Sequence, residues 1–189
     1  MLPLVANRCY RCRALSPGGL TCRSCRRSSK LYRVRAVTRY ELLAKELLGK
    51  LKFSGARAAA RTIASVMAEQ FEVPAEVVVL HVPTATSRVR LRGYDQAALI
   101  AKQFAYLTGA NYQSCLRRVG QHRQVGASRA QRLAQMQQSF EVSSRADIVG
   151  RHIFLIDDVM TTGATLEAAA ATLRAAGAKR VEAIVFARA

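Results

Sequence analysis

A thirteen-residue segment leaves this chain few choices of fold. It reads Ile153-Phe154-Leu155-Ile156-Asp157-Asp158-Val159-Met160-Thr161-Thr162-Gly163-Ala164-Thr165. Its first four residues are apolar and predict a buried strand, and an acidic pair stands at the end of that strand. A small turn then opens an Ala-rich stretch that is expected to be helical to about Ala176 and to end at Gly177. In an open α/β sheet, ligands bind at this carboxyl edge.

The segment predicts a site for a 5-phosphoribosyl group. The turn from Thr161 to Thr165 offers backbone N–H groups and hydroxyls at the positive end of a helix, which suits a phosphate dianion. Asp157 and Asp158 can accept hydrogen bonds from the two adjacent ribose hydroxyls. Two alternatives remain open from the residues alone. Either Thr162 or Thr165 merely caps the helix, or the paired acids form an aspartyl-phosphate or magnesium site.

The rest of the chain extends an α/β architecture. Helices, strands and a mostly parallel sheet with right-handed crossovers are predicted from the apolar spacing. The stretch from Arg117 to Gln138 is predicted to be a mobile loop because its first half has few apolar residues. The expected helices span 42–51, 57–71, 95–107 and 164–176, and the expected strands span 77–82, 153–156 and 181–186.

Four cysteines near the N-terminus predict a zinc site. Cys9-x2-Cys12 and Cys22-x2-Cys25 are two Cys-x-x-Cys pairs separated by nine residues. Four thiolates suit tetrahedral zinc, and metal binding would supply the folding free energy that this apolar-poor segment lacks. Disulfides are disfavoured in a reducing cytosol, and a redox Cys-x-x-Cys normally occurs singly. The fifth cysteine, Cys115, is expected to be an ordinary thiol.

The charge distribution favours a polyanionic partner. The formal net charge is +18, and ten Lys or Arg but no acid occur between Met1 and Tyr40. A second acid-free stretch from Gln96 to Phe140 holds six more basic residues. Nucleic acid is the expected partner, the alternative being an Arg-rich surface without a specific role. The candidates for nucleic-acid contact are Arg11, Arg13, Arg23, Arg26, Arg27, Arg123, Arg129 and Arg132.

The cysteine pairs followed by the thirteen-residue segment resemble the ComF family, bacterial proteins named for competence and DNA uptake. Intermediate segments share the resemblance, and two positions depart from it, because Asp95 and Gln135 stand where the family usually has Asn. The supporting segments are Leu51-Lys52-Phe53-Ser54-Gly55, Val82-Pro83, Arg92-Gly93-Tyr94-Asp95-Gln96-Ala97, and the positions Gln124, Arg132 and Phe140.

The resemblance implies a type I phosphoribosyltransferase fold over residues 36–189, preceded by a four-cysteine zinc module over residues 1–35. It also implies binding of 5-phosphoribosyl 1-pyrophosphate (PRPP) with Mg²⁺. Asp157 and Asp158 are the expected catalytic pair and would hold the ribose and magnesium. The 5-phosphate would lie on Thr161, Thr162, Gly163, Ala164 and Thr165, and the pyrophosphate near Thr84, Lys52, Arg88 and Arg92.

Three functions are compatible with these residues. The first is a competence protein that acts on single-stranded DNA with a ComFA-like helicase. The second is a metabolic phosphoribosyltransferase of nucleotide salvage, although Thr161 stands where purine-specific members carry an acidic general base. The third is a PRPP-sensing DNA-binding protein without activity. No apolar run is long enough to span a bilayer, so a cytoplasmic location is expected, with recruitment to the inner face of the membrane through an uptake complex and a homo-oligomer as open options.

Overall fold

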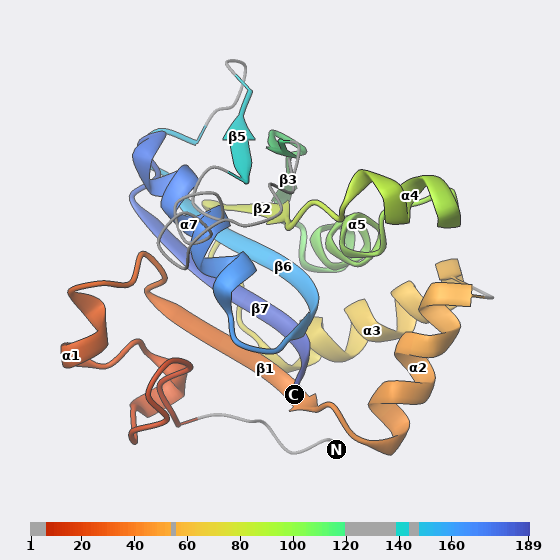
Figure 1. The fold of residues 1–189 in the computed structure, drawn as a ribbon, viewed down its shortest axis with the longest axis horizontal. Coiled ribbons are helices and arrows are strands. Elements are labelled where there is room, and N and C mark those ends of the chain that lie inside the picture. The colour runs from red at the N-terminus through yellow and green to blue at the C-terminus, as the bar shows by residue number, and fades with distance from the viewer. Residues whose placement is uncertain (1–6, 54–55, 120–138, 144–147) are drawn as a thin grey trace, which may run out of the picture.

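The computed structural model describes residues 7–53, 56–119, 139–143 and 148–189. Its centre is a five-stranded, all-parallel sheet with the strand order β1-β7-β6-β2-β3 (Figure 1). The strands are β1 (Arg33–Arg39), β2 (Val77–His81), β3 (Asn111–Tyr112), β6 (His152–Met160) and β7 (Arg180–Arg188). A separate antiparallel pair is formed by β4 (Leu116–Arg118) and β5 (Phe140–Val142).

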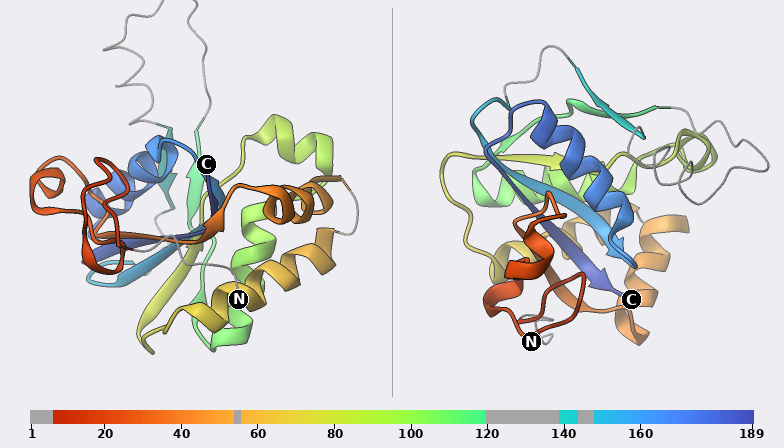
Figure 2. Two further views of the ribbon diagram at one scale, coloured as in Figure 1. Left: turned by 90° about the horizontal axis from the view of Figure 1, so that it is seen from below. Right: turned by 60° about the vertical axis from the view of Figure 1, so that its left-hand side comes forward.

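Helices cover both faces of the sheet. The longer helices are α2 (Leu42–Phe53), α3 (Ala56–Gln70), α5 (Gln96–Thr108) and α7 (Ala164–Ala175). The short ones are η1 (Pro17–Gly19), α1 (Arg23–Arg26) and α4 (Thr86–Arg92). Figure 2 shows α7 and the cysteine-bearing segment on one side of the sheet, with α2, α3 and α5 on the other. Each side has its own hydrophobic core, so the fold has three layers. Among the described residues, no helix is long and apolar enough to cross a membrane.

The predicted sheet and helices are confirmed, with differences at their ends. The strand expected at residues 153–156 extends to Met160, because β7 continues alongside it and pairs Asp157 with Val185 and Val159 with Ala187. The acidic pair therefore belongs to the last residues of β6 and does not follow the strand. A mobile loop was predicted for residues 117–138. Its start is wrong, because Arg117 and Arg118 belong to β4, and residues 120–138 lie outside the described residues.

Strand β1 was not predicted from the sequence. Its alternating Arg33, Val34 and Arg35 place two cations in a strand at the edge of the sheet. The neighbouring β7 accommodates them with Glu182, which is 4% exposed. The domain boundary predicted after residue 35 falls within this strand.

Glu182 holds three basic side chains together. Its carboxylate lies 3.8 Å from Arg33 Nε, 3.4 Å from Arg35 Nη2 and 3.2 Å from His152 Nε2. Burial alone would raise the pKa of Glu182, but the close contact with His152 and the charges of Arg35 and Arg33 lower it overall. The ionised carboxylate therefore stabilises the fold above the unfolded-state pKa of about 4.3. This contribution is lost as the pH falls through the lower folded-state pKa.

We expect Glu182→Gln to lower the free energy of unfolding at neutral pH by about 2 kcal/mol, because it leaves two partly buried cations without their buried carboxylate. It should also flatten the acid part of the stability profile. Urea unfolding from acidic to neutral pH measures both effects. The control is Glu141→Gln, which breaks an exposed 3.0 Å pair with Arg117 and should cost less than about 1 kcal/mol. Equal losses in the two variants would contradict this account.

Candidate functional site

The acidic pair lies at the carboxyl edge of the sheet, directly before α7 (Figure 1). Strand β2 ends beside β6 at this edge, since His81 pairs with Ile156 and the Val82 amide donates to the Ile156 carbonyl at 2.9 Å. The chain after β2, including Thr84, is thereby brought next to Asp157. Both predicted parts of the phosphoribosyl site therefore meet at one edge of the sheet.

Asp157 and Asp158 are half-buried carboxylates on consecutive residues. Asp157 Oδ1 accepts from the Asp158 amide at 2.9 Å, and Asp158 Oδ1 accepts from the Val159 amide at 2.8 Å. Burial, and secondly the charge of Asp158, raise the pKa of Asp157 well above its usual value. A pair of this kind favours a cation or hydroxyl donors beside it. Carboxylate oxygens are also the ligands that Mg²⁺ prefers, so the pair fits that ion.

The turn between β6 and α7 has the shape of an anion site. Thr161 and Thr162 are exposed, Ala164 and Thr165 are partly exposed, and the Ala164 amide donates to Thr162 Oγ1 at 3.3 Å. Gly163 caps the helix with a φ of 79°, a conformation that side chains strain to adopt. The turn directly precedes the N-terminus of α7, a helix of twelve residues. It therefore faces the positive end of the helix dipole.

Asp95 shapes the chain after β2. Its carboxylate accepts from the Thr84 amide at 2.8 Å and from Thr84 Oγ1 at 3.0 Å. It also caps α5 by accepting from the Ala98 amide at 3.2 Å. Asp95 therefore ties the predicted pyrophosphate segment to a helix N-terminus. Asp95, which stands where the ComF family usually has Asn, therefore positions the Thr84 segment.

We expect Asp95→Ala to lower the free energy of unfolding by about 1 to 2 kcal/mol, because the helix cap and the Thr84 contacts are lost together. Asp95→Asn, which keeps a good capping residue, should cost at most about half as much. Chemical denaturation of the two variants measures the difference. An alanine variant as stable as the original chain would contradict the positioning role.

Two of the predicted basic residues lie on α4, the helix that follows β2. Arg88 is exposed on α4, and Arg92 donates to Gln96 Oε1 at 2.6 Å, which occupies one of its donors. Lys52 belongs to α2, and its side chain lies outside the described residues. Thr84 itself is partly exposed.

Sequence reasoning missed Arg118. Its guanidinium lies 5.4 Å from the centre of the Phe140 ring, and its buried Nε has no hydrogen-bond partner among the described residues. Burial and then the charge of Arg88 lower the pKa of Arg118, whereas the charge of Asp157 opposes them. Arg118 is thus close enough to Arg88 and Asp157 to interact electrostatically with both. The sequence did not reveal Arg118 as a site residue, because residues 117–138 were predicted to be a loop and β4 has only three residues.

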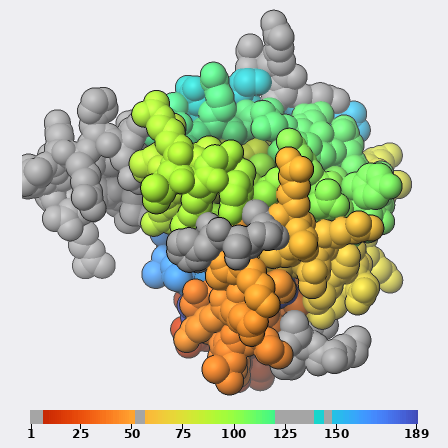
Figure 3. Space-filling model, turned by 90° about the vertical axis from the view of Figure 1, so that its right-hand side faces the viewer, coloured from red at the N-terminus to blue at the C-terminus, as the bar shows by residue number. Residues whose placement is uncertain are grey.

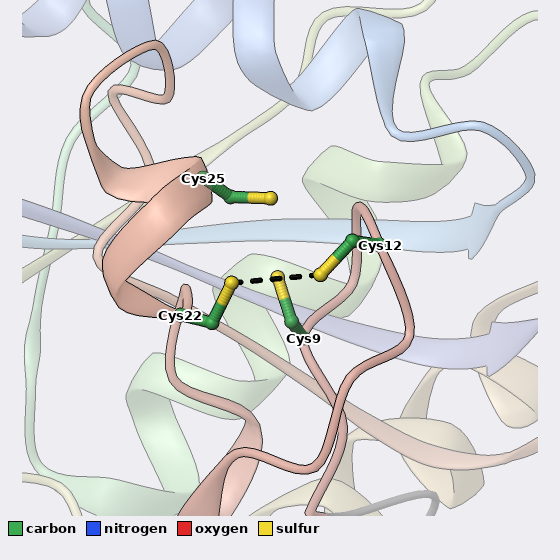
Figure 4. A group of neighbouring side chains, drawn as sticks. All are labelled: Cys9, Cys12, Cys22 and Cys25. Atoms are coloured by element: carbon green, nitrogen blue, oxygen red, sulfur yellow. Dashed lines mark hydrogen bonds between the residues drawn. The ribbon is translucent and has the colours of Figure 1, made fainter.

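The four predicted cysteines converge. Their sulfur atoms all lie within 4.8 Å of one another, and Cys12 Sγ and Cys22 Sγ are 3.5 Å apart (Figure 4). Ligands 2.3 Å from a tetrahedral zinc ion would be separated by about 3.8 Å, so the donor set fits zinc. The fifth cysteine, Cys115, is buried and lies outside this cluster.

The thiols of the cluster do not ionise alike. Hydrogen bonds, first from the Ser24 hydroxyl and then from the Cys25 backbone, lower the pKa of Cys22 to about 6. Burial and hydrogen bonds with the neighbouring thiols raise the pKa of Cys25 to about 12. Deprotonating all four sulfurs as zinc ligands would therefore require the positive charge of the ion between them.

The cysteine-bearing segment contacts the turn at the start of α7. A Cβ added to Gly163 would lie 3.1 Å from the Tyr10 ring. The Tyr10 hydroxyl donates to Glu167 in the first turn of α7 and lies 2.8 Å from Ser29 Oγ. The Lys30 amide donates to the same carboxylate at 2.6 Å. Tyr10 lies between two cysteine ligands, so the two predicted sites are in direct contact.

The predicted nucleic-acid residues divide into two groups. Arg11, Arg13, Arg23, Arg26 and Arg27 are exposed around the cysteine cluster. Arg123, Arg129 and Arg132 lie outside the described residues, as do Gln124 and Gln135 of the family resemblance.

A parallel sheet with an acidic pair before a glycine-capped helix defines a type I phosphoribosyltransferase-like protein. The chain belongs to the phosphoribosyl transferase domain family, which it matches over residues 53–189. It is similar to two solved structures, each with a TM-score of 0.50 over 68% of this chain. One is "the allosteric regulatory enzyme of purine biosynthesis", 23% identical and covered over 25% of its length. The other is the glutamine PRPP amidotransferase from B. subtilis, 21% identical and covered over 26%. At these identities, the likeness confirms the fold alone.

Two curated relatives are named for competence. Competence protein F of Haemophilus influenzae is 30% identical over 145 residues, which cover 75% of this chain and 60% of that protein. Competence protein ComFC of Streptococcus pneumoniae is 28% identical over 148 residues, which cover 78% of this chain and 64% of that protein. The chain thus spans less than two thirds of the length of these relatives. The predicted resemblance to the ComF family is confirmed.

Proposed function

We propose that this chain binds PRPP together with Mg²⁺ and acts on single-stranded DNA during natural competence. The observation that carries the proposal is the acidic pair Asp157 and Asp158, placed before the glycine-capped start of α7 in a phosphoribosyl transferase domain. Competence is supported by the names of the relatives. DNA is supported by the net charge of +18.

In this proposal each part of PRPP has its own partner. The ribose hydroxyls lie on Asp157 and Asp158, and the 5-phosphate lies on the turn from Thr161 to Thr165. The pyrophosphate lies beside Thr84, with positive charge from Lys52, Arg88, Arg92 and Arg118. Asp157 and Asp158 would hold Mg²⁺, which would supply positive charge for the pyrophosphate. Zn²⁺ held by the four cysteines has a structural role.

Transfer would follow from the same arrangement. A nucleophile attacks C1 of the ribose, the bond from C1 to the pyrophosphate oxygen breaks, and pyrophosphate leaves with the bonding electrons. The chain contributes positioning and charge stabilisation for the leaving group. Thr161 cannot act as a carboxylate base, so a purine acceptor is disfavoured.

Two measurements separate this proposal from its rivals. Pyrophosphate release in the presence of an acceptor distinguishes a phosphoribosyltransferase from a PRPP sensor. Single-stranded DNA binding whose affinity falls with salt distinguishes a competence role from nucleotide salvage, because phosphate contacts release counterions. PRPP binding without any DNA binding would overturn the competence proposal in favour of a salvage enzyme.

The cellular setting follows from that role. We infer a cytoplasmic protein that is recruited to the inner face of the membrane by an uptake complex, in which a ComFA-like helicase is its partner. Pull-down of that helicase with the zinc-loaded chain tests the partnership, and sedimentation of the chain alone tests for a homo-oligomer.

A further inference from the structure

A basic groove separates the cysteine-bearing segment from the end of α7. The hollow has a volume of about 680 Å³ and lies between residues 26–32 on one side and α7 with the start of β7 on the other. No Asp or Glu lines it. We call it the α7 groove, and five cations line it: Arg26, Lys30, Arg174, Lys179 and Arg180.

Three of these five cations, Arg26, Arg174 and Arg180, are held by contacts that do not neutralise them. Arg26 and Arg180 contact the Tyr32 ring, with guanidinium carbons 5.2 Å and 4.2 Å from its centre. Arg174 donates to the carbonyl oxygens of Ala178 and Lys179. Within the described part of the chain, none of the five forms an ion pair with a carboxylate. The groove therefore carries a positive charge that no ion pair compensates, part of it on side chains held by contacts.

The groove continues toward the turn between β6 and α7, residues Thr161 to Thr165, which we call the phosphate turn. A second hollow of about 320 Å³ is lined by Arg11, Thr162 and Gly163, and it shares Lys30 and Ala171 with the α7 groove. Glu167 also lines this second hollow, and its carboxylate accepts from the Ser29 hydroxyl at 3.0 Å and from the Lys30 amide at 2.6 Å. Basic residues therefore lie toward both ends of α7, beside one acid whose oxygens are hydrogen-bonded. A helix of twelve residues is about 18 Å long, which is enough for several successive phosphates.

We propose that the α7 groove binds the sugar–phosphate backbone of single-stranded DNA, an assignment that rests on the function proposed above. Ordered cations along a narrow hollow are typical of sites that follow a single strand. The Tyr32 ring already contacts two guanidinium groups, so it is not a free surface for base stacking. The groove is therefore expected to contact phosphates, and its affinity should not depend on the base sequence of the DNA.

The test compares two variants that remove equal charge. The groove variant is Lys30→Gln/Lys179→Gln/Arg180→Gln, all three exposed. The control is Lys45→Gln/Arg57→Gln/Arg61→Gln, also exposed, on α2 and α3, on the face shown in Figure 3. Each set includes one cation that contacts a tyrosine ring, Arg180 with Tyr32 and Lys45 with Tyr40. Fluorescence anisotropy with an oligothymidine strand gives the affinity at several salt concentrations.

We expect the groove variant to lose at least about 10-fold in affinity. Its salt slope should fall by about 2, since each phosphate contact with a single strand contributes about 0.7. The control should lose only a few-fold. PRPP binding and zinc content, measured on the same samples, should stay unchanged and show that both variants are folded.

Three outcomes would overturn the assignment. If the zinc-loaded wild type does not bind the strand, the DNA role proposed above fails together with the groove. If the wild type binds and the two variants lose affinity equally, the groove alone is wrong. If the groove variant keeps its DNA affinity but no longer captures the helicase partner, the groove is a protein-binding surface.

Discussion

In the double variant Asp157→Asn/Asp158→Asn, we expect magnesium-dependent PRPP binding to fall by about 100-fold or more. Charge-assisted contacts contribute about 1.5 to 3 kcal/mol each, and every 1.4 kcal/mol is tenfold in affinity. The substitutions should not lower the stability of the fold. Burial and the charge of Asp158 raise the pKa of Asp157. The ionised form of Asp157 therefore destabilises the folded state above the unfolded-state pKa. The asparagine variant should therefore be at least as stable at neutral pH. Calorimetry and urea unfolding measure the two properties.

The control for this variant is Glu69→Gln/Glu72→Gln, two exposed acids at the end of α3 and just beyond it. It removes the same charge from the chain and should leave PRPP affinity within about 2-fold, because exposed distant charges are screened by salt. A double asparagine variant that binds PRPP as tightly as this control would show that the acidic pair does not hold the ribose.

The second large effect concerns zinc. We expect one zinc ion per chain, and we expect Cys12→Ser to lose it together with the fold of residues 7–30, because structural zinc sites supply folding free energy. Tyr10 would then no longer be held against Gly163 and Glu167. PRPP affinity should fall by about 5-fold to 100-fold, the usual range for coupled sites. Metal analysis and PRPP titration of the same sample check both parts.

The matched control is Cys115→Ala, which removes the buried cysteine outside the cluster. It should keep its zinc and its PRPP affinity, although a buried side chain is shortened. A zinc-free Cys12→Ser protein with undiminished PRPP affinity would contradict the coupling between the cysteine cluster and the phosphate turn.

Local patterns predicted the parts of the fold that local chemistry determines. Strand β6, the turn and α7 are consecutive in sequence, so apolar spacing, the small turn and Gly177 after the helix were sufficient to find them. Strand β1 was missed because Arg33 and Arg35 look solvent-exposed until Glu182, far away in the sequence, is placed beside them. Alternating charge hides a strand whose charges are satisfied by tertiary contacts.

The candidate site shows the same division. The acidic pair, the phosphate turn and the four cysteines are short motifs, and the structure brings the residues of each motif together. The contacts of Asp95 with Thr84 and of Tyr10 with Glu167 join separate segments, so no periodicity predicts them. The α7 groove likewise depends on the packing of one segment against another.

Titration of Mg²⁺ and PRPP into the zinc-loaded wild-type chain tests the central claim most directly. The account predicts one binding site per chain, with affinity that depends on Mg²⁺ and is lost in the double asparagine variant. A folded, zinc-loaded chain that binds no PRPP would contradict it, and the phosphoribosyl transferase domain would then serve this protein only as a scaffold.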